Sequence, residues 1–156
     1  LFLALGGDYQ FTHCTVVTYA NRYIDHRDPV LTVSNFANNS SNNLNAIFRN
    51  CIFWGENGIV NDEVVVLKNG STIFNVDFDH NLWKVQTIPS NITSNQIINN
   101  QPPQFDSINT SRNYYDFRLA TTSPAINKGV NTAVITDLDG KIRPVGLPDL
   151  GCFEKQ

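Results

Sequence analysis

The sequence predicts an all-β fold in which short parallel strands stack in successive coils, as in a solenoid. One reason is repetition, because three segments of the chain align without gaps. Another is composition: only 16% of the 156 residues are charged, and Asn, which tolerates the left-handed backbone of tight bends, is the most abundant residue. In addition, no window shows sustained helical periodicity. We therefore expect one domain of many short strands separated by tight bends.

The aligned segments are Tyr9–Val17, Ala46–Trp54 and Val76–Lys84. They share an aromatic residue, then a His or Asn two places later, then a Cys or Asn. The positions are Phe11, Phe48 and Phe78; His13, Asn50 and His80; and Cys14, Cys51 and Asn81. Up to the aromatic position, inward-facing and outward-facing residues alternate, as in a strand with one buried face. The next inward position comes three residues later, so the His or Asn between them is expected to form a bend that resets the side-chain face.

Stacked coils would place equivalent residues about 4.8 Å apart, so like side chains should form ladders inside the stack. We expect the three phenylalanines in one buried column and Cys14, Cys51 and Asn81 in a second. After the bend, Val16, Phe53 and Trp83 should also point inward. Parallel side chains in such a ladder have poorly directed Cβ vectors, so we expect Cys14 and Cys51 to remain free thiols.

The intervals between the repeats exceed one minimal coil, so loops must be inserted. The turn-rich segments Ser34–Asn45 and Ser90–Gln104 are the candidates. Glu63–Leu67 is a near-continuous apolar run, which is typical of a buried parallel strand. The short strands alone would also permit a β-sandwich or a jelly roll.

The last third of the chain carries the most specific motifs. They read N-Y-Y-D-F-R-L from Asn113, S-P-A-I-N-K-G from Ser123, D-L-D-G-K-I-R from Asp137 and D-L-G-C-F-E from Asp149. This pattern resembles the closing segment of secreted bacterial right-handed parallel β-helix proteins, often labelled choice-of-anchor Q. The resemblance implies parallel β-helix coils with inserted loops in residues 1–105. It also implies a C-terminal capping module of the same domain in residues 106–156, in which Arg143 and Asp149 pair or cap backbone groups.

The resemblance implies a bacterial protein that is secreted or held at the cell surface or outer membrane. The function expected from it is a non-catalytic scaffold or a carbohydrate-binding part of such a protein. One alternative is a fragment of a polysaccharide lyase or glycoside hydrolase whose active residues lie in missing N-terminal coils. Another is an adhesin-like structural rod. The family has no catalytic motif to carry over to this chain.

Three aromatic residues are candidates for stacking against a sugar ring, namely Trp54, Tyr114 and Tyr115. No catalytic residue, metal ligand or cofactor is predicted. Asp77 and Asp79 should point outward, but Arg49 stands opposite Asp79 in the neighbouring coil, so an ordinary cross-strand ion pair accounts for that acid. Asp137–Gly140 lacks the further ligands of a calcium loop and predicts a β-turn with Gly at the left-handed position. The three histidines do not converge in the sequence.

The net charge of −3 comes without a basic stripe, which argues against nucleic acid as a partner. No stretch reaches the ~20 apolar residues that a membrane helix needs, so no membrane insertion is expected. A polysaccharide or other glycan is the expected partner. Leu1–Leu5 is apolar and lacks the features of a signal peptide, so it is interpreted as a strand truncated on its N-terminal side. We expect a fragment of a longer β-helix whose exposed first coil associates end to end with another copy.

Overall fold

The computed structural model describes residues 1–156 and is all-β, with fifteen strands and no helix. Three parallel sheets contain most of the strands, and two small antiparallel hairpins complete the fold. The all-β prediction is confirmed, and the parallel pairing excludes the predominantly antiparallel sandwich and jelly roll.

The three parallel sheets are named A, B and C. Sheet A has the order β1 (Phe2–Leu3), β4 (Leu31–Ser34), β9 (Val64–Leu67). Sheet B has the order β12 (Thr93–Asn95), β10 (Phe74–Asp79), β7 (Leu44–Arg49), β2 (Gly7–Thr12). Sheet C has the order β13 (Ile98–Asn99), β11 (Leu82–Trp83), β8 (Ile52–Glu56), β3 (Thr15–Tyr19). The hairpins are β5 (Phe36–Ala37) with β6 (Ser40–Ser41), and β14 (Phe105–Asn109) with β15 (Tyr114–Leu119).

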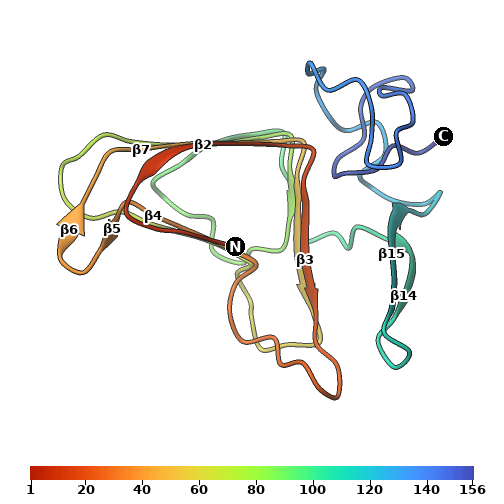
Figure 1. The fold of residues 1–156 in the computed structure, drawn as a ribbon, viewed down its shortest axis with the longest axis horizontal. Coiled ribbons are helices and arrows are strands. Elements are labelled where there is room, and N and C mark those ends of the chain that lie inside the picture. Colours follow the sequence, from red (N-terminus) through yellow and green to blue (C-terminus); the bar gives the residue numbers. More distant parts are fainter.

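The chain visits the sheets in turn. It runs from β2 to β3 to β4, and then from β7 to β8 to β9, so each circuit adds one strand to sheets B, C and A. Seen in projection, the circuits lie over one another and enclose a common interior (Figure 1). That interior contains the main core, to which all three sheets contribute.

The predicted phenylalanine column is confirmed. Phe11 pairs in register with Phe48, and Phe48 with Phe78. The rings stack with centroids 5.3 Å and 4.6 Å apart. Phe48 and Phe78 are completely buried, whereas Phe11 is half-buried because β2 is the edge strand of sheet B.

The predicted bend and second column are confirmed too. His13, Asn50 and His80 have φ values of 54°, 55° and 53°, in the left-handed region that His and Asn enter more readily than most residues. Along the second column the Cys14 amide donates to Cys51 Sγ at 3.4 Å, and the Cys51 amide donates to Asn81 Oδ1 at 2.8 Å. All three cysteines of the chain are free thiols.

Segment Ser90–Gln104 corrects the prediction of an inserted loop. It contains β12 and β13, which pair in parallel with β10 and β11 and so add one strand each to sheets B and C. Gln96 takes the bend position with a φ of 50°, and Ile97 packs on the main core. The repeat was hidden because Ser94 replaces the aromatic residue and Ile97 replaces the Cys or Asn. The other expected insertion, Ser34–Asn45, does contain a separate hairpin, β5–β6.

The C-terminal segment lies beside the stack rather than over one end of it (Figure 1). A second apolar core joins the outer face of sheet C to this segment; it contains Ile52, Trp54, Leu82, Phe105, Leu119, Ala125 and Leu150. The Gly151 amide donates to Asn50 O at 2.8 Å, and the Cys152 amide donates to Thr15 Oγ1 at 3.1 Å. Residues 106–156 therefore pack against the outer face of sheet C, and their role as a capping module stays a prediction.

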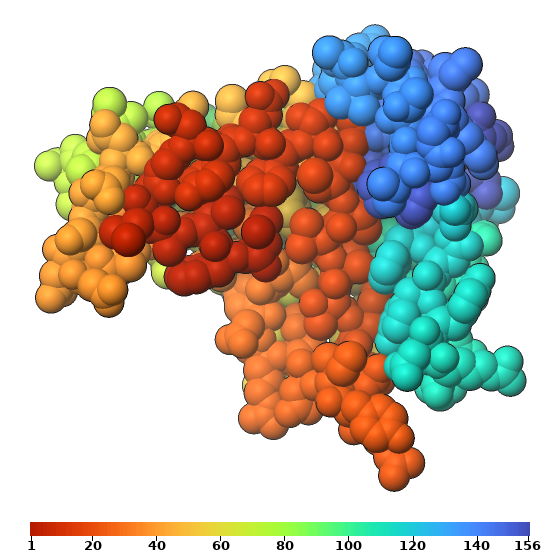
Figure 2. Space-filling view, viewed as in Figure 1, coloured from red at the N-terminus to blue at the C-terminus, as the bar shows by residue number.

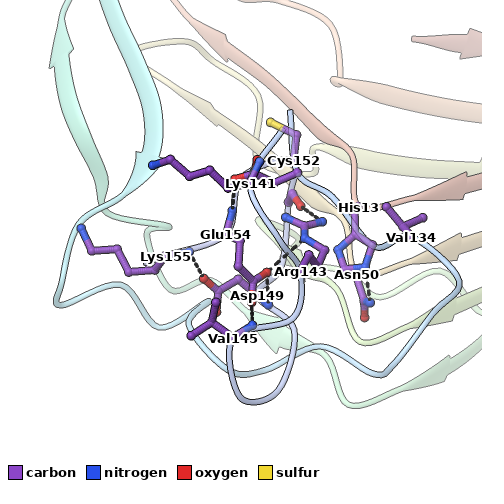
Figure 3. A network of polar contacts seen from close by, with 12 residues as sticks. His13, Asn50, Val134, Lys141, Arg143, Val145, Asp149, Cys152, Glu154 and Lys155 are labelled. Atoms are coloured by element: carbon purple, nitrogen blue, oxygen red, sulfur yellow. Dashed lines mark hydrogen bonds and ion pairs between the residues drawn. The ribbon is translucent and has the colours of Figure 1, made fainter. Parts of the chain in front are cut away.

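A buried polar network holds this segment in place (Figure 3). Asn50 Nδ2 donates to Val130 O at 2.7 Å, while Asn50 Oδ1 accepts from the Val130 amide at 2.9 Å. Arg143 Nε lies 3.0 Å from Glu154 Oε2, and both side chains are almost completely buried. The predicted backbone-capping roles are confirmed: Arg143 donates to Gly151 O, and Asp149 accepts from two backbone amides.

The turn at Asp137–Gly140 forms as predicted. Asp137 Oδ1 accepts from the amides of Asp139 and Lys141 at 2.9 and 2.8 Å, and Gly140 has a φ of 76°. At the other end of the chain, Leu1 and Phe2 are exposed while Leu3 packs on the main core. The expected self-association through this edge stays a prediction.

We expect the protein to lose stability in mild acid because of His13. Its side chain is buried, and its Nε2 accepts from Asn50 Nδ2 at 3.1 Å, a role that requires a neutral ring. Burial, reinforced by the charge of Arg143, lowers the pKa of His13 from 6.5 to about 4. The unfolded chain therefore takes up a proton before the folded one does. The resulting stability is complete above pH ~6.5 and is lost as pH falls toward 4, by about 3 kcal/mol in total.

Chemical denaturation at a series of pH values measures this loss. The His13→Asn variant should lack this component of the acid sensitivity, because Asn also adopts the left-handed bend. His80→Asn is the matched control, since His80 occupies the same kind of bend with a more exposed side chain. An unchanged pH profile in His13→Asn would contradict the assignment.

Candidate functional site

Trp54 is not available for sugar stacking. It lies in β8 on the outer face of sheet C and is only 4% exposed, because the C-terminal segment covers that face. Its Nε1 donates to Glu56 Oε1 at 2.9 Å. The prediction for Trp54 is therefore wrong, and the reason is a contact between segments that are distant in the sequence.

Tyr114 and Tyr115 are neighbours on β15 and so point to opposite faces of the β14–β15 hairpin. Tyr114 is 55% exposed and belongs to neither apolar core. Tyr115 is half-buried and turns toward Tyr19 at the end of β3. The structure therefore separates the two predicted tyrosines and gives Tyr115 a partner.

Tyr19, Tyr115 and Phe117 form an aromatic cluster between sheet C and the hairpin. The ring centroids of Tyr19 lie 6.3 Å from those of both Tyr115 and Phe117, and Tyr115 and Phe117 are 6.0 Å apart. Sequence analysis did not select Tyr19. The available signal was its place on the strand, two residues beyond Val17 and hence on the outer face with it.

These rings line a hollow of about 270 Å³, which we call the aromatic groove. Its lining residues are Val17, Thr18, Tyr19, Ile24, Tyr115 and Phe117. Ile24 comes from the loop of residues 20–30, which links β3 to β4. In the space-filling view this loop (orange) and the hairpin (cyan) project beside each other from the lower part of the molecule (Figure 2). The groove is thus built from a strand, a loop and a hairpin.

Polar groups at the rim fix the loop to the hairpin. Asn21 Nδ2 donates to Asn113 Oδ1 at 3.0 Å and to the Tyr115 hydroxyl at 3.3 Å. Asn21 Oδ1 accepts from the amides of Tyr23 and Ile24, which orders the start of the loop. Burial, with the nearby charge of Glu56, raises the pKa of Tyr19, so its hydroxyl stays neutral.

The same loop also lines a second, larger hollow of about 580 Å³, whose lining includes Asn21, the residue that bonds Tyr115 at the rim of the groove. Its lining is mainly polar: Ala20, Asn21, Asp25, His26, Arg27, Asn57, Gly58 and Ile59. The loop of residues 20–30 therefore separates an apolar hollow from a polar one. Because residues of this loop line both hollows, the position of the loop affects the shape of each.

The structure does not bring the other candidate residues together. Asp79 pairs with Arg49 at 3.1 Å, as predicted, and with His80 at 2.7 Å. Burial opposes the charge on Asp79, but hydrogen bonds from His80, Asn95 and Arg49 outweigh it and lower the pKa of this carboxyl. His13 contacts Thr132 of the C-terminal segment, while His26 contacts Glu63. No three residues of the metal-ligating types gather to form a metal site.

Comparison of the chain with protein-family models, curated proteins and solved structures finds no match. None of the chain forms a helix of the length and apolar character required to cross a membrane.

Proposed function

We propose that this chain is part of a secreted or surface-held bacterial right-handed parallel β-helix protein that binds carbohydrate in the aromatic groove. Two features support the solenoid. Successive strands enter three parallel sheets in a repeating order, and equivalent residues of successive turns pair in register. The C-terminal motifs that resemble those of the choice-of-anchor Q group support its secreted, bacterial character.

The observation that carries the binding proposal is the half-buried aromatic lining of the groove, which leaves part of each ring open to solvent. Ligand sites combine apolar and aromatic walls with a few placed polar groups. Tyr19, Tyr115 and Phe117 supply ring faces that suit the C–H face of a sugar ring. The amide of Asn21 and the Tyr115 hydroxyl lie at the rim, where the hydroxyls of a sugar would lie. These groups bind without reacting, which favours a binding function over a catalytic one.

A glycan array followed by calorimetric titration of the best ligand tests this proposal. Tyr19→Ala and Tyr115→Ala should each weaken binding by about 2 kcal/mol, roughly thirtyfold in Kd, as is usual for an aromatic anchor. Tyr114→Ala is the matched control, because its ring faces away from the groove, and it should bind as the unmodified protein does. Thermal unfolding of each variant separates loss of binding from loss of fold.

Other outcomes discriminate among the alternatives. Equal binding by Tyr115→Ala and Tyr114→Ala would contradict the groove as the site. Turnover of an acidic polysaccharide by the unmodified protein would favour the lyase or hydrolase. An absence of both binding and turnover would favour the adhesin-like rod.

A further inference from the structure

A buried acid–base pair anchors the loop of residues 20–30. Glu63 Oε2 lies 3.1 Å from His26 Nε2, and the two side chains are 0% and 2% exposed. The same oxygen accepts from the Val30 amide at 3.2 Å. One carboxyl group therefore attaches the loop to the stack at two points, in its middle and at its end.

Around this pair, the loop packs directly against the backbone at Gly55 and Gly58. A Cβ at Gly55 would overlap His26 and Glu63, and a Cβ at Gly58 would overlap the backbone and side chain of His26. The Ile59 amide donates to His26 O at 3.2 Å. The two glycines thus provide the space that the closed loop requires.

The ionised form of Glu63 is poorly accommodated in this closed arrangement. Its Oε1 accepts no hydrogen bond, and Lys84 Nζ lies 4.0 Å from that oxygen and donates to Gly55 O instead. His26 and Lys84 are the charged or titratable groups that face the carboxyl from the surrounding elements. Asp25 and Arg27 flank His26 but pair with each other at the surface.

A buried carboxylate with an unpaired oxygen carries a free-energy cost that the neutral acid does not. Burial accordingly raises the pKa of Glu63, and this effect exceeds the opposing effects of His26, the Val30 amide and Lys84. Opening of the loop would expose the carboxyl to water and restore its ordinary pKa.

We propose that the loop of residues 20–30 is a proton-controlled latch on the aromatic groove, closed while Glu63 is neutral and loosened when Glu63 ionises. The closed form binds the proton more tightly than the open form does. Closure is therefore favoured at low pH and is lost as pH rises through the raised pKa, by at most about tenfold per pH unit for one proton. Opening would withdraw Ile24 and Asn21 from the groove. The consequence for a ligand rests on the proposed function, whereas the loop movement does not.

Limited trypsin cleavage measures the latch, because Arg22 and Arg27 both lie in the loop. Cleavage at Arg112, in the turn of the β14–β15 hairpin, is the internal reference for the activity of trypsin. In the unmodified protein, loop cleavage relative to Arg112 should rise as the solution is taken from mildly acidic to mildly alkaline. Glu63→Gln, which keeps a neutral acceptor in place, should stay at the low-pH value throughout. Asp8→Asn, which removes an exposed carboxylate from sheet B, should behave as the unmodified protein.

Two results would overturn the latch. One is a pH-independent cleavage ratio in the unmodified protein, which tests the latch even if Glu63→Gln does not fold. The other is faster loop cleavage in Glu63→Gln, because the charge of Glu63 would then be holding the loop closed. Titration of a glycan identified on the array separates the two proposals. If cleavage follows pH and no glycan binds, the latch stands and the proposed function fails. If a glycan binds to the unmodified protein and to Glu63→Gln with the same pH dependence, the latch does not control the groove.

Discussion

Replacing Phe48 by alanine is expected to lower the free energy of unfolding by about 3–5 kcal/mol, the usual cost of deleting a core aromatic side chain. Phe48 is completely buried and lies in the middle of the aromatic column. Its ring stacks on those of Phe11 and Phe78 and meets the edge of Phe53, with centroids 5.7 Å apart in the last pair. Close packing on both sides leaves little room for the neighbours to collapse into the cavity, so the cost should lie near the upper end of this range. Urea denaturation monitored by tryptophan fluorescence measures it.

Phe11→Ala is the matched control for Phe48→Ala. Phe11 occupies the same column on the edge strand and is only half-buried, so its removal should cost clearly less. Equal costs for the two substitutions would mean that the column does not form the interior of the stack. A cost below about 1 kcal/mol for Phe48→Ala would contradict its buried placement.

Replacing Arg143 by methionine is expected to cost about 3–5 kcal/mol, because it leaves the carboxylate of Glu154 buried without its cation. The two side chains are 1% and 0% exposed, and their closest atoms lie 3.0 Å apart. Glu154 also accepts from the amides of Val145 and Asp149, so it cannot turn away to solvent without releasing both. Denaturant unfolding measures the loss. A second readout is the pKa of His13, measured by NMR, which should rise because the charge of Arg143 contributes to its lowering.

Arg118→Met is the matched control for Arg143→Met. Arg118 lies 2.6 Å from Asp139 and 2.9 Å from Asp116, which are contacts at least as short as that of Arg143. Its side chain is 47% exposed, however, and exposed ion pairs contribute only about 0–1 kcal/mol. If both substitutions cost the same, desolvation is not the reason for the larger effect expected at Arg143.

The repeating turns were predictable because their signal is local. The positions of Phe48, Asn50 and Cys51 are set by alternation along a strand and by one bend, and both depend on neighbouring residues. The repeat at Ser90–Gln104 was missed because Ser94, which pairs with Phe78, and Ile97 differ in type from the equivalent residues of the other segments. A repeat that keeps its backbone conformation but changes its side chains is invisible to a comparison of side chains.

The candidate site was predictable only in part. Tyr115 was selected because an aromatic ring can stack against a sugar, but its neighbours in the groove, Tyr19 and Ile24, are distant in the sequence and meet it through packing. Trp54 was selected for the same reason and proved buried, since nothing in residues 1–105 indicates that the hairpin covers sheet C. The pairing of His26 with Glu63 was missed for a similar reason, because 37 residues separate them.

The sequence by itself determined the all-β class, the aromatic and cysteine columns, the left-handed bends and the Asp137–Gly140 turn. These features follow from backbone preference and from the period of burial, which act over a few residues. The tertiary structure decided where residues 106–156 pack, and with that which aromatic side chains remain exposed. It also placed a carboxyl group in a site where its charge is poorly tolerated. Such features depend on which surfaces exclude water from one another, and that is set only when distant segments meet.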